Sequence, residues 1–192
     1  MKYNQTTRWL HAGIALGVST QLMVSLIMDE PKPGRPFTGL GAAAFEVHET
    51  TGLIIATLLL LHWLALFSGH IPIGFGHLFP WFSKQRICTI IGEINRQWVQ
   101  RRLDDTQQTS ALAGAVHGLG LLVTTLMALT GIAIYLGMAE NGAMPPLIKG
   151  IKEVHELTSN LLWAYLVGHA GIAVLHQWLG HHTLTDMFKL GK

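Results

Sequence analysis

Four long apolar segments divide the chain into candidate membrane-spanning helices. They run from about 9 to 28, 47 to 67, 111 to 136 and 154 to 179, and nearly all charged residues lie outside them. About 20 mostly apolar residues in a helix cross the hydrocarbon core of a bilayer, because each residue rises about 1.5 Å. The pattern therefore predicts an all-α fold, a transmembrane four-helix bundle that forms a single integral-membrane domain over residues 1–192.

Composition supports a membrane location. Hydrophobic residues make up 49% of the 192 positions and charged residues only 12%, whereas about 25% of an average soluble chain is charged. The single Cys excludes an internal disulfide and any Cys-based zinc or iron–sulfur site held by this chain alone. A net charge of +2 with sparse charges gives no sign of nucleic-acid binding. Membrane lipid is the expected partner, and the composition leaves the oligomeric state open.

Lys and Arg are distributed unevenly around the four segments. The loops that stay in the cytoplasm usually carry the excess of these residues. One side of the predicted bundle has nine of the thirteen: Lys2, Arg8, Lys84, Arg86, Arg96, Arg101, Arg102, Lys189 and Lys192. We therefore expect a multi-pass protein of the bacterial inner membrane with both termini cytoplasmic. The first segment lacks a small-residue cleavage site and is expected to remain as a helix.

The long second loop, Ser68 to Ser110, has a pattern of its own. Bulky apolar residues such as Ile87, Ile91 and Trp98 alternate with charged residues. That mixture is typical of an amphipathic helix in the plane of the membrane interface. We predict such an additional interfacial helix on the inner side, with a plain solvated linker as the alternative.

A short internal repeat draws attention to the histidines. The hexapeptides Glu46–Thr51 (EVHETT) and Glu153–Thr158 (EVHELT) are nearly identical, and each is expected at the outer mouth of an even-numbered span. These spans run in the same direction, so His48 and His155 should lie at one depth, as a pseudo-two-fold axis along the membrane normal would place them. Another His follows fourteen residues later in each span, at His62 and His169. Fourteen helical residues return to nearly the same face, about 21 Å deeper.

Paired histidines at matching depth suit haem iron. Two neutral imidazoles on facing helices form a complete pair of axial ligands, whereas zinc or copper normally needs three or four converging ligands. Two haems stacked across the bilayer would explain the fourteen-residue spacing. The residues alone leave the inner pair open, because symmetry pairs His62 with His169 while depth equally permits His11 with His169.

The residues at several of these positions also match the motifs of a known family. Arg8-Trp9-Leu10-His11 opens the first span, His48 lies at the start of the second, and the stretch from His155 through His169 to His176 runs along the fourth. The chain resembles the bacterial cytochrome b561 and nickel-hydrogenase or formate-dehydrogenase cytochrome b superfamily over all four spans. The resemblance implies two haem b groups, one held by His48 and His155 and one by His11 and His169. Relatives often have Arg in place of His62, which makes His62 a candidate contact for a haem propionate.

The resemblance also implies a function. Relatives pass electrons between the quinone pool and a redox partner, or oxidise superoxide with quinone as acceptor. We therefore expect a dihaem b-type membrane electron carrier. It acts either as the cytochrome subunit of a dehydrogenase- or hydrogenase-type complex or as a stand-alone superoxide:quinone oxidoreductase. The long second loop resembles that of such cytochrome subunits. The alternative is a four-helix membrane transport or metal- and proton-binding module without haem.

A quinone site is expected at the inner ends of the third and fourth spans. A His can take or give the proton that accompanies each quinone electron. The polar and basic residues predicted to converge there are His117, His176, Gln177, Arg101 and Arg102.

Overall fold

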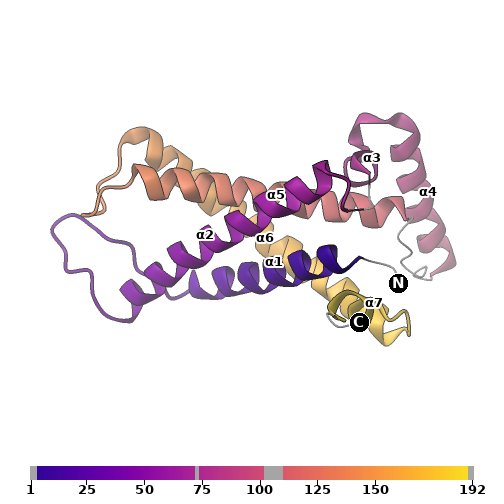
Figure 1. Ribbon diagram of the computed structural model, residues 1–192, viewed down its shortest axis with the longest axis horizontal. Coiled ribbons are helices and arrows are strands. Elements are labelled where there is room, and N and C mark those ends of the chain that lie inside the picture. The colour runs from indigo at the N-terminus through magenta and orange to yellow at the C-terminus, as the bar shows by residue number, and fades with distance from the viewer. Residues whose placement is uncertain (1–3, 72–73, 102–109, 190–192) are drawn as a thin grey trace. The chain divides into compact units, whose positions relative to one another are not determined.

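The computed structural model describes residues 4–71, 74–101 and 110–189, and every regular element in these ranges is helical. The elements, labelled in Figure 1, are α1 (Gln5–Val24), α2 (Leu40–Phe67), α3 (Phe75–Leu78), the 3-10 helix η1 (Pro80–Phe82), α4 (Lys84–Gln100), α5 (Ala111–Gly137), α6 (Pro146–Trp178) and α7 (Thr183–Phe188). The predicted all-α class is confirmed.

Three of the described helices are long and apolar enough to cross a membrane. They are α2, α5 and α6, with 28, 27 and 33 residues. Helix α1 has 20 residues and is not among them. The second, third and fourth predicted spans thus correspond to helices of sufficient length and hydropathy. The fourth crossing, which α1 would supply, stays a prediction, as do the four-helix bundle and the cytoplasmic termini.

Two of the helices begin about two turns before the predicted spans. Helix α2 begins at Leu40 and α6 at Pro146, so the repeated hexapeptides lie well inside their helices, and their place at the outer mouths of the spans stays a prediction. The physical reasons are local. Ala42–Ala44 are strong helix formers, and Pro is favoured at the first helical position, where its missing N–H costs no hydrogen bond.

The chain divides into two compact units. Unit 1 comprises the described residues of Met1–Trp9, His62–Leu122 and Ala164–Lys192, and unit 2 comprises Leu10–Leu61 and Val123–Trp163. Helices α1, α2, α5 and α6 each contribute residues to both units.

Unit 2 holds α1 closely against α2. A Cβ added to Gly17 would lie 2.6 Å from Cγ1 of Ile55, which is closer than side chains tolerate. Glycine therefore permits this helix contact, as small residues commonly do in membranes. The loop after α1 touches the loop after α5, because Gly142, at φ +81°, lies directly against the carbonyl of Pro31. Both loops thus lie at one end of unit 2 (Figure 1).

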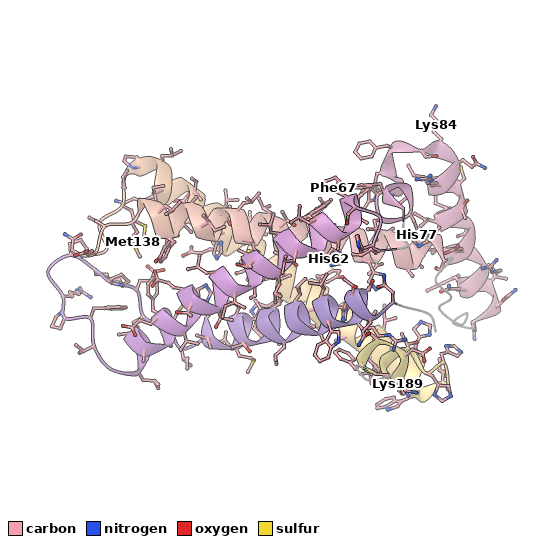
Figure 2. The ribbon with its side chains drawn as sticks, viewed as in Figure 1. His62, Phe67, His77, Lys84, Met138 and Lys189 are labelled. Atoms are coloured by element: carbon pink, nitrogen blue, oxygen red, sulfur yellow. The ribbon has the colours of Figure 1, made fainter. Side chains whose placement is uncertain are left out.

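Unit 1 holds the short helices of the second loop. Backbone of α3 approaches α5 at Gly118, where any Cβ would collide with the carbonyl of Leu78. Aromatic rings from α2 pack on this segment: Trp63 stacks on Phe79 at 5.9 Å, and Phe67 lies 5.0 Å from Phe75 between ring centroids. Figure 2 labels Phe67 and His77 in this region.

The carboxylate of Glu93 on α4 closes the start of α5. The backbone N–H groups of Ala111 and Leu112 donate to its two oxygens at 3.1 and 3.0 Å, and the Ser110 hydroxyl donates at 3.0 Å. The first N–H groups of a helix have no partner inside the helix and favour negative charge. Glu93 thereby ties the second loop to a membrane-spanning helix.

A helix does form in the second loop, as predicted. None of the residues of α4 is buried, and Ile87, Ile91, Ile94 and Trp98 are exposed along one face. That apolar face is typical of an interfacial helix. Its position at the membrane interface stays a prediction.

The C-terminal helix α7 is held at both ends within unit 1. Leu184 and Thr185 donate their backbone N–H groups to Oε1 of Gln177 at 3.1 and 3.3 Å. Arg8, only 4% exposed, donates from Nη1 to the carbonyl of Lys189 at 2.8 Å. Lys189 is labelled in Figure 2.

Candidate functional site

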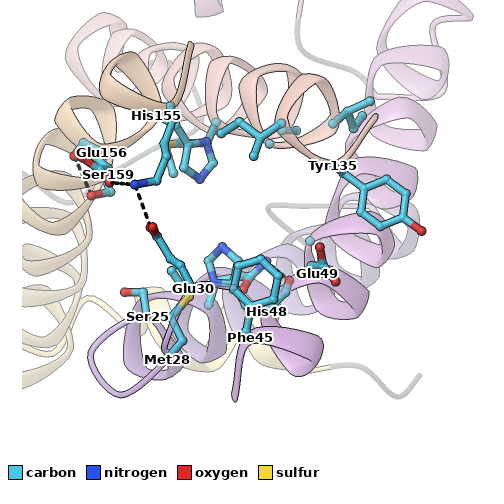
Figure 3. A pocket seen from close by; sticks show the side chains of 18 of the residues that line it. Ser25, Met28, Glu30, Phe45, His48, Glu49, Tyr135, His155, Glu156 and Ser159 are labelled. Atoms are coloured by element: carbon cyan, nitrogen blue, oxygen red, sulfur yellow. Dashed lines mark hydrogen bonds and ion pairs between the residues drawn. The ribbon is translucent and has the colours of Figure 1, made fainter. Parts of the chain in front are cut away.

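Unit 2 encloses a cavity of about 510 Å³ lined by residues of α1, α2, α5 and α6 and of the loops between them. His48 on α2 and His155 on α6 point toward one another across it (Figure 3). Their ring centroids are 6.4 Å apart, with an angle of 79° between the planes. The two histidines of the repeat therefore lie together, although their helices begin earlier than the sequence suggested.

This separation fits two imidazoles that share one metal. A metal–imidazole nitrogen bond is about 2.0 Å and the ring centre lies about 1 Å beyond the nitrogen, so two such rings on opposite sides of a metal have centroids about 6 Å apart. Among the described residues no group of three or more His, Cys, Asp or Glu is arranged to hold a metal ion. The cavity thus offers two imidazoles beside a space with largely apolar walls.

The orientation of His155 is set by α5. Its Nδ1 lies 2.8 Å from Oγ1 of Thr130, which is 9% exposed. The Thr130 hydroxyl itself donates to the carbonyl of Leu126 at 2.8 Å. A hydroxyl has only one proton to give. When that proton goes to the Leu126 carbonyl, the Thr130 oxygen accepts from His155 and Nδ1 carries the hydrogen. The other ring nitrogen, Nε2, is then the one with a lone pair for a metal.

His48 is held by α1 instead. The side-chain Nε2 of Gln21 donates to the backbone carbonyl of His48 at 2.8 Å, and the backbone of Gln21 faces the imidazole. His48 Nδ1 is buried, and no described residue gives it a hydrogen bond of normal geometry. A buried nitrogen in this condition is what an unfilled ligand site leaves behind.

Gly131 makes room for His155. A Cβ at this position would lie 3.3 Å from Cε1 of the His155 ring, closer than most real contacts. Thr130 and Gly131 are neighbours on α5, and one bonds the ring while the other leaves space for it.

Charged groups lie on the cavity wall one turn from His155. Lys152 pairs with Glu30 and Glu156, each at 2.8 Å, and Figure 3 shows both contacts. The carboxylates and lysines that line the cavity are four acids and two lysines: Asp29, Glu30, Glu49, Glu156, Lys32 and Lys152. The sequence places Lys152 on the outer side, and the structure adds the two carboxylates that bind it.

The inner histidine candidates fall in different units. His11 belongs to unit 2, whereas His62 and His169 belong to unit 1. His62 lies on α2 with a buried Nδ1 that has no hydrogen-bond partner among the described residues. Both possible partners of His169 therefore stay predictions.

Around His169 the structure adds two neighbours. The ring of Tyr165 stacks on it at 5.3 Å with a 9° tilt, and His117 on α5 meets it edge-on, also at 5.3 Å. Gly120 lets Tyr165 approach α5, because a Cβ there would overlap the phenol. His117, predicted as a quinone contact, is thus in contact with a predicted haem ligand.

The other predicted quinone contacts are described one by one or lie outside the described residues. His176 is 4% exposed, and its Nδ1 lies 2.7 Å from Nδ1 of His181 in the turn to α7. Its part in a quinone site stays a prediction. Arg101 ends α4 in a left-handed conformation and is exposed. Arg102 lies outside the described residues, so the convergence on a quinone stays a prediction.

His77 on α3, which the sequence did not single out, lies close to α5 at Gly114. Burial lowers the pKa of His77 below its usual value. The Glu93 carboxylate raises this pKa and the Arg86 cation lowers it, so these two effects oppose one another.

Comparison with known families decides what such a cavity is for. Residues 2–190 match the family model described as prokaryotic cytochrome b561. The chain belongs to this family. No curated protein and no solved structure matches it.

Membership identifies a membrane cytochrome of the haem b type. The cavity between His48 and His155 fits that cofactor in ring separation, in the Thr130 contact that orients His155 and in the unpartnered Nδ1 of His48. For a cytochrome b561, the histidine repeat is the most informative motif in the sequence.

Sequence reasoning missed the residues that support His48 and His155. Thr130 and Gly131 lie in a mostly apolar stretch, and Gln21 follows two other polar residues near the end of a helix. Their importance depends on which face of a neighbouring helix they meet, and no signal within one helix gives that register. A weak indication was available for Thr130 and Gln21, as polar side chains inside predicted spans.

Proposed function

We propose that this cytochrome is a dihaem electron carrier that links a redox donor to the membrane quinone pool. The observation that carries the proposal is the pair His48 and His155, which face one another at 6.4 Å across a cavity. Membership of the prokaryotic cytochrome b561 family supplies the cofactor type.

In this proposal His48 and His155 would hold one haem b. Bound haem supplies one-electron redox chemistry at its iron. The chain contributes position and environment: α2 and α6 present the imidazoles, Thr130 fixes one tautomer, and the apolar walls limit access of water.

A second haem b is proposed on the inner side, held by His169 and His11. The family resemblance of Arg8-Trp9-Leu10-His11 supports His11 over His62. Tyr165, which stacks on His169, restricts rotation of the ring. His62 remains the candidate contact for a propionate.

The quinone is proposed to bind near the inner ends of α5 and α6. Reduction of a quinone to a quinol takes two electrons and two protons, so the carrier must deliver electrons one at a time and protons must reach the ring. His117 and His176 supply imidazoles that can transfer protons. Arg101 and Arg102 are the candidate basic contacts.

The charge around the cavity favours a protein donor over superoxide. Four carboxylates and two lysines line it, and an excess of negative charge repels a small anion. The exposed apolar face of α4 and the length of the second loop also suit a cytochrome subunit of a dehydrogenase- or hydrogenase-type complex. We therefore propose the subunit role first and the superoxide:quinone oxidoreductase second.

The proposed location is the bacterial inner membrane with both termini in the cytoplasm. Nine of the thirteen Lys and Arg residues lie on the side that this orientation makes cytoplasmic.

Absorption spectroscopy of the purified protein tests the proposal. We expect a Soret band, sharp b-type bands on reduction with dithionite, and two haems per chain. A folded but colourless protein would instead support the transport or metal- and proton-binding alternative.

Activity separates the two donor hypotheses. If superoxide reduces quinone rapidly through the isolated protein, and not through a preparation freed of haem, the protein is an oxidoreductase by itself. If quinone reduction appears only with a co-purified dehydrogenase or hydrogenase and its substrate, the protein is a cytochrome subunit.

Separate His11→Ala and His62→Ala variants decide the inner pair. The proposal expects loss of the inner haem in the first variant and its retention in the second. The reverse result would assign His62 as the ligand.

A further inference from the structure

Thr130 and Gly131, which are neighbours on α5, both lie against the imidazole ring of His155 in unit 2. Thr130 Oγ1 lies 2.8 Å from His155 Nδ1, and the missing side chain of Gly131 leaves 3.3 Å between its ideal Cβ position and His155 Cε1. Two consecutive residues of α5 thus act on the His155 ring: Thr130 makes a polar contact with it, and Gly131 leaves space for it.

We propose that Thr130 is a positioning residue that tunes the redox potential of the haem held by His155. The proposal rests on the proposed function, because it requires His155 to be an axial ligand. It assigns Thr130 a role beyond packing, although it touches neither the haem nor the quinone.

The hydrogen-bond geometry carries the argument. Thr130 lies in the interior of a helix, where a hydroxyl usually bonds the carbonyl four residues back, and it does so to Leu126 at 2.8 Å and to Met127 at 3.1 Å. When its single proton is engaged in this way, the Thr130 oxygen accepts from His155 and the hydrogen lies on Nδ1. The proposal assigns this tautomer, and the backbone of Met127, which also faces the imidazole, supports it.

An acceptor at Nδ1 has two effects on a ligating imidazole. It fixes the tautomer that leaves Nε2 for the metal, and it increases the electron donation of that nitrogen. Stronger donation stabilises the ferric more than the ferrous state, so it lowers the midpoint potential.

The test compares Thr130→Val with Thr130→Ser by redox titration of the visible bands. The outer haem is identified as the component that His155→Ala removes. Loss of a contact of this kind typically weakens metal binding by 10–100-fold. If the ferric form alone is weakened tenfold, the midpoint potential of the outer haem rises by about 59 mV. Thr130→Ser keeps the hydroxyl and should restore the wild-type potential.

Thr57→Val is the matched control. Thr57 lies on α2 of the same unit and bonds the carbonyl of Leu53 at 2.9 Å in the same backbone pattern, but it lies on an exposed face. The midpoint potential of the outer haem should be unchanged in Thr57→Val. Thr130→Ala serves as a second variant if Val prevents folding, because it removes the hydroxyl without adding bulk at the branch.

The outcomes distinguish this proposal from the proposed function. If His155→Ala retains both haems, the ligand assignment is wrong. If His155→Ala loses one haem but Thr130→Val and Thr130→Ala titrate like Thr57→Val, only the tuning role is wrong. A shift in Thr130→Ser as large as in Thr130→Val would attribute the effect to packing and would also overturn it.

Discussion

At the scale of single residues, His155 illustrates how an apolar helix can position a polar ring. Thr130 bonds Nδ1, Gly131 leaves room for Cε1, and His48 faces the ring across the cavity. The hexapeptide repeat predicted that His48 and His155 face one another, because it places them at equivalent positions of two helices. It could not predict Thr130 or Gly131, since their role depends on how α5 packs beside α6.

Gly131→Ala tests whether the His155 ring needs the space that Gly131 leaves for it. The new Cβ would lie 3.3 Å from His155 Cε1, so the ring must shift by a few tenths of an ångström. We expect weaker retention of one haem, by about tenfold, measured as the rate of haem transfer to an excess of apomyoglobin.

Gly150→Ala is the control for that prediction, because it lies on α6 and its ideal Cβ position has no neighbour within 4 Å among the described residues. Equal transfer rates in the two variants would show that the His155 ring needs no such clearance.

At the scale of elements, the hydropathy pattern predicts the helices better than their ends. Helix α5 begins at Ala111 as predicted. The apolar run of the sequence begins there, directly after Ser110, whose hydroxyl accepts from the N–H of Ala113 and caps the helix. Helices α2 and α6 begin earlier than predicted, because alanine and an N-terminal proline extend a helix without adding to an apolar run. A charged residue distant in sequence, Glu93, completes the cap of α5, and no local pattern reveals that contact.

Glu93→Ala tests the cap. Removal of the carboxylate leaves the N–H groups of Ala111 and Leu112 without their acceptor, and loss of a helix cap costs about 0.5–2 kcal/mol. Hydrogen exchange of the peptide that covers residues 111–116 should therefore accelerate.

Glu140→Ala, which removes an exposed carboxylate between α5 and α6, should leave exchange in residues 111–116 at the wild-type rate. If Glu93→Ala also leaves it unchanged, the cap does not contribute to the stability of this helix end.

At the scale of the whole molecule, the number of crossings determines where the termini lie. Three described helices qualify as spans by length and hydropathy, and α1 would be the fourth. An even number of crossings places both termini on one side, whereas three crossings place them on opposite sides. The charge distribution favours an even number, because only four of the thirteen Lys and Arg residues, Lys32, Arg35, Lys149 and Lys152, lie on the side opposite the predicted termini.

Labelling of single cysteines in intact cells tests this topology. In a Cys88→Ser background, Gln5→Cys and Lys189→Cys should both resist a membrane-impermeant maleimide, while Arg35→Cys in the loop after α1 should react. Labelling of one terminus but not the other would show that α1 does not cross the membrane.

Haem quantification in two single variants tests the central claim most directly. We predict two haems per chain in the wild-type protein and in His70→Ala, which changes an exposed histidine of the second loop. His48→Ala and His155→Ala should each retain one haem, with the same component lost from the redox titration. Retention of both haems in either variant would contradict the assignment of the His48–His155 cavity as a haem site.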